Sequence, residues 1–167
     1  TGTTATGTGT VTATISGGGP TCAFNPAKTH LVPADGVPAL LQRILLPHGL
    51  FEFELVDCVP GGVVTVSTTW PNLRGITGYL KYGPTPATGL GKKVWYVPNN
   101  LQIRGNTVTY TIRDGGLGDD DLLANGRIVD PGGPVIQADA PGVDDAYPVP
   151  GLSFTWLMAL AGLLAVL

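Results

Sequence analysis

The sequence predicts an all-β protein, an antiparallel β-sandwich in the immunoglobulin-like or Greek-key style. Glycine (25) and proline (15) together make up nearly a quarter of the 167 residues, which favours tight turns over helices. Short runs of alternating apolar and polar residues recur between turn signals, at intervals of roughly 8 to 15 residues. No long helical pattern separates these runs. Strands that follow one another in this way are typical of an antiparallel sandwich or barrel.

Length and charge narrow the possibilities further. The chain suits one domain with extensions: a Thr/Gly-rich strand extension at 1–19, a β-sandwich domain at 20–134, a linker at 135–149 and a hydrophobic segment at 150–167. Only 13% of the residues are charged, and the net charge is −3. Because the sequence has no basic cluster, we expect no nucleic-acid partner.

The first 16 residues alternate almost strictly, with threonine at the even positions from Thr4 to Thr14 and small or β-branched residues between them. This pattern predicts a strand with one slim face. Two interpretations remain open. The segment is either the first strand of the domain after a glycine-rich lead-in, or a strand that pairs with a neighbouring subunit. In the second case the contact residues are Thr8, Thr10, Val11, Thr12 and Ile15.

The middle of the chain predicts a series of short strands. Phe51, Phe53 and Leu55 alternate with glutamates, and Pro60-Gly-Gly62 predicts a hairpin turn to the next strand. Residues 38–45 have helical spacing and fit either a short helix or a covering loop. Further strands are expected at 63–70, 78–82, 93–97, 101–103 and 107–112.

An acidic, glycine-rich loop follows the strand at 107–112, and Ile128-Val129 and Asp130-Pro-Gly-Gly-Pro134 end the unit. Its carboxylates offer the hard oxygen ligands that Ca²⁺ prefers, so Ca²⁺ is the one cofactor that the sequence suggests. The spacing does not match an EF-hand. The other interpretation is a turn whose aspartates cap backbone amides. The candidate metal ligands are Asp114, Asp119, Asp120, Asp121 and Asp130.

No catalytic constellation is recognisable, and we expect the protein not to be an enzyme. His30 and His48 have no Cys, Asp or Glu neighbours at metal-ligand spacing. Glu52 and Glu54 lie on the outward face of a predicted strand, where a solvated role is favoured over a glycosidase pair. The sequence also lacks a nucleophile–base pair and a cofactor-binding loop.

Residues 152–167 are apolar almost throughout. As a helix these 16 residues would extend about 24 Å, whereas a bilayer core requires roughly 20 residues, about 30 Å. This segment must enter a membrane, a partner or a filament core. Val149-Pro-Gly-Leu-Ser153 resembles the start of Ile-Pro-Thr-Leu-type, PEP-CTERM-like sorting tails, although the basic cluster expected after the apolar segment is missing. The candidate subunit contacts of the hydrophobic segment are Phe154, Trp156, Leu157, Leu160 and Leu164.

The run from Asn106 to Pro134, with its Asp-Gly-Gly-Leu-Gly-Asp-Asp-Asp and Ile-Val-Asp-Pro-Gly-Gly-Pro motifs, resembles the bacterial choice-of-anchor U domain. The resemblance continues upstream in Pro47–Phe53, Asp57–Gly61 and Lys81–Pro84, and covers roughly residues 20 to 134. It implies an exported, cell-surface protein and supplies no catalytic residues.

Cys22 and Cys58 are the two cysteines of the chain. Two distant cysteines are buried thiols in a cytosolic protein and one disulfide in an exported one. The resemblance favours the disulfide, because members of the family usually have cysteine at both positions. Such a bridge contributes about 3 to 4 kcal/mol in the chain-entropy model.

Together these features predict a non-catalytic structural protein that is secreted or displayed on the bacterial cell surface. We expect a homo-oligomer or polymer, a self-assembling subunit of an extracellular fibre or matrix that uses strand addition and packing of the hydrophobic tail. The alternative is a membrane-anchored, Ca²⁺-dependent adhesin or binding module, in which the C-terminal segment contacts the membrane.

Overall fold

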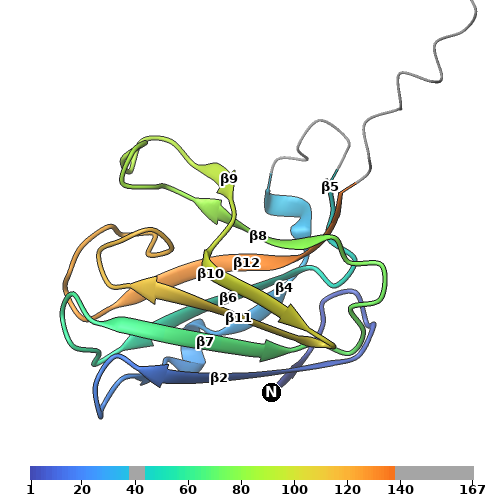
Figure 1. Cartoon of the computed structure of the whole chain (residues 1–167), viewed down its shortest axis with the longest axis horizontal. Coiled ribbons are helices and arrows are strands. Elements are labelled where there is room, and N and C mark those ends of the chain that lie inside the picture. Colours follow the sequence, from blue (N-terminus) through green and yellow to red (C-terminus); the bar gives the residue numbers. More distant parts are fainter. Residues whose placement is uncertain (38–43, 138–167) are drawn as a thin grey trace, which may run out of the picture.

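The computed structural model describes residues 1–37 and 44–137. Most of the linker at 135–149, the whole hydrophobic segment at 150–167 and most of the predicted short helix at 38–45 lie outside the described residues. Within them the protein is all-β, with two antiparallel sheets and no α-helix (Figure 1). Two 3-10 helices, η1 (Pro26–Lys28) and η2 (Ala34–Gly36), interrupt the strands.

The described part of the chain contains no helix that is long and apolar enough to cross a membrane.

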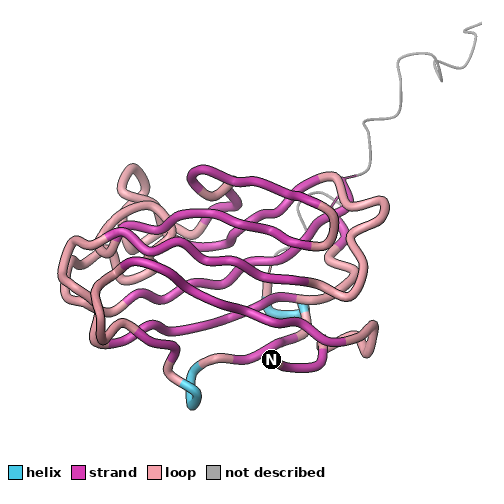
Figure 2. Tube along the Cα trace, turned by 60° about the horizontal axis from the view of Figure 1, so that its bottom comes forward, coloured by secondary structure: helices cyan, strands magenta, loops and turns pink. Residues whose placement is uncertain are grey.

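The first sheet has five strands in the order β1-β2-β7-β11-β10. The second has seven, with a main path β3-β6-β12-β8-β9, while β4 pairs with β6 and β5 with β12. The strands run along the long axis and the loops collect mainly at the two ends (Figure 2). The bounds of the first sheet are β1 Gly2–Thr3, β2 Thr10–Gly17, β7 Val63–Thr69, β11 Thr107–Arg113 and β10 Asn99–Arg104. Those of the second are β3 Ala23–Phe24, β6 Leu50–Val56, β12 Ile128–Gln137, β8 Gly78–Gly83, β9 Val94–Tyr96, β4 His30–Val32 and β5 Ile44–Leu45.

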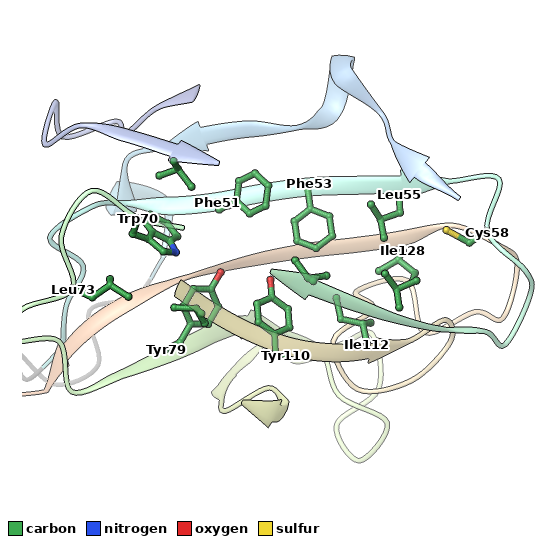
Figure 3. Close-up of a cluster of buried hydrophobic side chains, with 14 residues drawn as sticks. Phe51, Phe53, Leu55, Cys58, Trp70, Leu73, Tyr79, Tyr110, Ile112 and Ile128 are labelled. Carbon is green, nitrogen blue, oxygen red and sulfur yellow. The ribbon is translucent and has the colours of Figure 1, made fainter. Parts of the chain in front are cut away.

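The two sheets share one core. Alternate residues of β6, β7 and β11 are fully or almost fully buried, as period-two alternation predicts. The rings of Trp70, Tyr79 and Tyr110 follow one another through the interior, with centroids 6.4 Å and 5.3 Å apart (Figure 3). The indole N–H of Trp70 donates to the hydroxyl of Thr68 at 2.9 Å, so the buried donor is satisfied.

The N-terminal strand is an integral part of the first sheet. β2 pairs with β7 from Thr12 opposite Thr69 to Gly17 opposite Val64. Of the two interpretations left open by the sequence, the structure therefore agrees with the first, in which this segment is the first strand of the domain. The slim face predicted from the sequence turns toward the core, where Val11 is 2% exposed, while the threonines face outward.

The predicted hairpin at Pro60-Gly-Gly62 is also wrong. β6 and β7 belong to different sheets, so this turn carries the chain across the core. Both strands have one buried face, and that pattern suits two strands that face each other as well as two that lie side by side. Only the contacts across the core distinguish these two arrangements of β6 and β7.

The prediction that Asp130-Pro-Gly-Gly-Pro134 ends the domain is wrong. Instead β12 spans Ile128–Gln137 and lies in the middle of the second sheet. It pairs with β6 from Ile128 to Gly132 and with β8 from Gly132 to Val135. Each half is thus paired mainly on one side, and a proline whose nitrogen faces the unpaired side removes no ladder hydrogen bond.

The end of the predicted short helix differs as well. Ile44 and Leu45 form β5, opposite Gln137 and Ile136 of β12. A helix and a strand cannot be distinguished from the spacing of so short an apolar run.

Candidate functional site

The acidic loop between β11 and β12 closes one end of the two sheets. One carboxylate oxygen of Asp114 accepts hydrogen bonds from the backbone N–H of Gly61, at 2.8 Å, and of Gly126, at 2.9 Å. Gly61 belongs to the β6–β7 connection and Gly126 to the acidic loop itself. Asp114, which is 2% exposed, therefore joins two loops that are far apart in the sequence.

The next aspartates hold the loop in shape. Asp119 accepts from the backbone N–H of Gly115 at 2.8 Å and of Val129 at 3.1 Å. Asp121 accepts from the backbone N–H of Leu123 at 2.9 Å. These bonds confirm the interpretation that the aspartates cap backbone amides.

The five candidate Ca²⁺ ligands do not form one cluster. Asp114, Asp119 and Asp121 each bind different backbone groups, and Asp130 binds a lysine. Among residues 1–37 and 44–137, no group of three or more His, Cys, Asp or Glu side chains is arranged to hold a metal ion. Ca²⁺ binding stays a prediction.

A buried ion pair lies between β8 and β12. Lys81 Nζ is 2.7 Å from Asp130 Oδ2, and both side chains are 0% exposed. The Tyr110 hydroxyl donates to the same Oδ2 at 3.2 Å, and Lys81 donates to the Gly118 carbonyl at 3.2 Å. Lys81 Nζ also lies 4.9 Å from the centre of the Tyr110 ring. The lysine is thus enclosed by three groups that it can contact favourably.

Sequence reasoning missed Lys81, although a signal was present. In the β8 run Gly78-Tyr-Leu-Lys-Tyr82, Tyr79 and Lys81 share one face of the strand. If Tyr79 faces the core, Lys81 must do so as well. Because a lysine is rarely buried, its presence suggests that this face of the strand is exposed to solvent.

Two glycines leave room for the charged side chains of Lys81 and Asp120. A Cβ at Gly118 would lie 2.7 Å from Lys81 Nζ, and Gly118 has a φ of +101° that other residues rarely adopt. A Cβ at Gly83 would collide with the carboxylate of Asp120. The glycines of the acidic run therefore make room for charged side chains as well as forming turns.

Burial sets the electrostatics of the pair. Loss of hydration lowers the pKa of Lys81 and raises the pKa of Asp130, against the attraction between them. Both shifts favour the uncharged forms. Burial, followed by the Asp130 charge, also raises the pKa of Tyr110.

Asp120 lies beside the pair. Its Oδ1 is buried and has no hydrogen-bond partner in the described part of the chain. Burial, with the Asp130 charge next, raises the pKa of Asp120 to about 7. Asp120 and Asp130 line a cleft of about 550 Å³ together with Lys93, Arg127 and Glu54. Arg127 is half-exposed and lies 3.3 Å from both Glu54 and Asp121, where an ion pair contributes little.

The predicted subunit contacts of the N-terminal segment are used within the chain. Thr8 lies 2.7 Å from Nδ1 of His48, whose Nε2 donates to the Asn72 carbonyl at 2.6 Å. In the neutral imidazole, in which Nε2 is the donor, Nδ1 accepts from the Thr8 hydroxyl. The buried His48 thus fastens the loop between β1 and β2. Thr10 faces Thr3, Thr12 faces Thr69 and Ile15 faces Val66.

The disulfide is present. Cys22 and Cys58 are bridged, with an S–S distance of 2.06 Å, across 36 positions of sequence. Cys22 lies just before β3 and Cys58 just after β6, the strand with which β3 pairs. The bond therefore links the beginning of β3 to the end of β6 in the second sheet.

Comparison with protein-family models, with curated proteins and with solved structures finds no match to this chain.

Proposed function

We propose that the protein is a non-catalytic structural subunit, exported by a bacterium and assembled outside the cell. In this proposal the two sheets form an immunoglobulin-like β-sandwich of the choice-of-anchor U type. The Cys22–Cys58 disulfide supports export, because such bonds persist in oxidising compartments. The acidic loop supports a structural role, because its carboxylates bind the backbone of their own chain.

The observation that carries self-assembly is the open edge of the first sheet. β10 lies at the end of the strand path, and most of its residues are exposed. At the other end, β1 covers only Thr10 and Val11 of β2. The remaining backbone of each edge strand can accept another strand.

The directions of these strands suit addition of a second copy. Each pairing from β2 through β7 and β11 to β10 is antiparallel, so β2 and β10 run in opposite directions. The β2 of one copy can therefore extend the sheet beyond the β10 of another in the same alternating order. A contact between two different edges does not close on itself, and its repetition builds a fibre.

The test is electron microscopy of the full chain, with and without residues 150–167, which we propose pack between or beside subunits. We expect filaments from the full chain. Single particles at every concentration would overturn the proposal. If removal of residues 150–167 abolishes the filaments, while a charge placed on the edge strand β10 (Ile103→Lys) leaves them unchanged, assembly would belong to the tail alone.

The second candidate function is a Ca²⁺-dependent binding module, for which the unpartnered Oδ1 of Asp120 beside the charged cleft offers one oxygen ligand. Calorimetric titration with Ca²⁺ tests it. Binding that is lost in Asp120→Asn and kept in Asp57→Asn, an exposed aspartate before Cys58, would support this candidate. Absence of binding heat would exclude it.

A further inference from the structure

We propose that Lys81 and Asp130 join covalently, forming an amide bond between the lysine Nζ and the aspartate side-chain carbonyl carbon. The bond would connect β8 to β12 inside the second sheet. The proposal is independent of how, or whether, the protein assembles.

The geometry places the two reacting groups together. Lys81 Nζ lies 2.7 Å from one carboxyl oxygen of Asp130, so the carboxyl carbon is only one bond further away. The groups are held by pairing of their strands, in which Gly132 faces Lys81. Reactants held in this way behave as if present at effective concentrations on the order of 10⁵–10⁸ M.

The surroundings favour condensation over a stable ion pair. In water an ammonium and a carboxylate are too well hydrated to react. Here both side chains are fully buried, and the hydrogen-bonding partners of the pair, apart from each other, are the Gly118 carbonyl and the Tyr110 hydroxyl. The Tyr110 ring lies against Lys81 Nζ, and Asp130 Oδ1 has no hydrogen-bond partner among the described residues. A neutral amine and a neutral carboxylic acid are therefore less costly in this place than two charges.

The step balances without any further reactant. The lone pair of the neutral amine attacks the carboxyl carbon and a C–N bond forms. The bond from that carbon to one carboxyl oxygen breaks, and the oxygen leaves as water with its own proton and one from the amine. Nothing is oxidised or reduced.

Neighbouring groups assist each part of this step. The Tyr110 hydroxyl donates to Oδ2 and would stabilise negative charge that develops there. The Gly118 carbonyl accepts a hydrogen bond from Nζ and orients the amine. Asp130 is one of the residues around the charged cleft, so the released water has only a short way to solvent.

The experiment measures the mass of the full wild-type chain after folding, reduction of the disulfide and denaturation. We expect a mass lower by one water molecule than the sequence requires. Tryptic mapping should show no cleavage after Lys81, and a peptide containing Lys81 joined to a peptide containing Asp130.

Two variants separate this bond from other losses of water, such as cyclisation at Asp114-Gly115. Lys81→Met should restore the full mass, whereas Lys93→Met, which changes a lysine of the same cleft, should keep the loss. If Lys81→Met fails to fold, the wild-type peptide map decides alone. A folded wild-type chain with full mass and normal cleavage after Lys81, or with water lost elsewhere, would overturn the proposal.

Discussion

Individual side chains hold this protein together through polar contacts in places where an apolar core would be expected. Asp114 joins two distant loops, His48 fastens the N-terminal loop, and Lys81 and Asp130 form a pair in the interior. Because each of these groups is buried and has at least one partner, removing one of them leaves a buried polar group without compensation. The cost of such substitutions should exceed that of similar changes at the surface.

His48→Leu tests this expectation for a neutral group. The change keeps an apolar side chain beside Trp70 but leaves the Asn72 carbonyl without the histidine donor. We expect unfolding in urea to show a loss of about 1 to 3 kcal/mol. His30→Leu is the matched control, since His30 is exposed and should change stability by less than about 0.5 kcal/mol. Equal losses in the two variants would contradict the structural role of His48.

The raised pKa of Asp120, about 7 against 3.8 in an unfolded chain, predicts a pH dependence of stability. Between these values the folded state binds the proton more tightly than the unfolded state, so stability falls as the pH rises from 3.8 toward about 7. The groups that act on Asp120 are Asp130, Lys93, Lys81 and Asp119.

We therefore expect a higher Tm at about pH 5 than at about pH 8. Asp120→Asn cannot titrate and should reduce this difference, although Asp119, whose pKa burial raises to about 6, acts in the same direction. Asp57→Asn should retain the whole difference. A Tm that rises with pH over this range in the wild type would show that other groups dominate.

At the scale of elements, the glycines and prolines of β12 explain why the strand could not be predicted from the sequence. Asp130-Pro-Gly-Gly-Pro134 combines two residues that usually end strands. Yet a Cβ at Gly132 would lie 2.9 Å from the Tyr79 ring, and one at Gly133 would lie 2.5 Å from the Gly49 carbonyl oxygen. These glycines permit close packing, and only the tertiary neighbours reveal this role.

Gly133→Ala tests the packing role of β12. The added methyl would meet the backbone of Gly49, which cannot move as a flexible side chain can. Overpacking of this kind typically costs about 1 to 3 kcal/mol. Gly78→Ala is the control, because its Cβ would meet nothing nearer than Val135 at 3.7 Å. Urea midpoints should fall clearly for Gly133→Ala and remain close to wild type for Gly78→Ala. The reverse order would contradict the assigned packing.

Sequence reasoning succeeded where structure is local. Alternation located the strands around Phe51–Leu55, Val63–Thr69 and Thr107–Ile112, and the aspartates of the acidic loop were recognised as candidates for backbone capping. It failed where distant segments meet. The partner of Asp114 at Gly61 is 53 positions away, and no local pattern indicates it. The burial of Lys81 likewise depends on Asp130 of a different strand.

At the scale of the whole molecule, the account rests on assembly through the open edges of the first sheet. The most direct measurement is sedimentation of the full chain, with its disulfide intact, as wild type and as two lysine variants. Ile103→Lys places a charge on the edge strand β10, which disfavours strand addition. Leu90→Lys makes the same change in the exposed loop between β8 and β9.

We expect large assemblies from the wild type and from Leu90→Lys, and a monomer from Ile103→Lys. A monomeric wild type, or an Ile103→Lys variant that assembles as the wild type does, would contradict assembly through this edge.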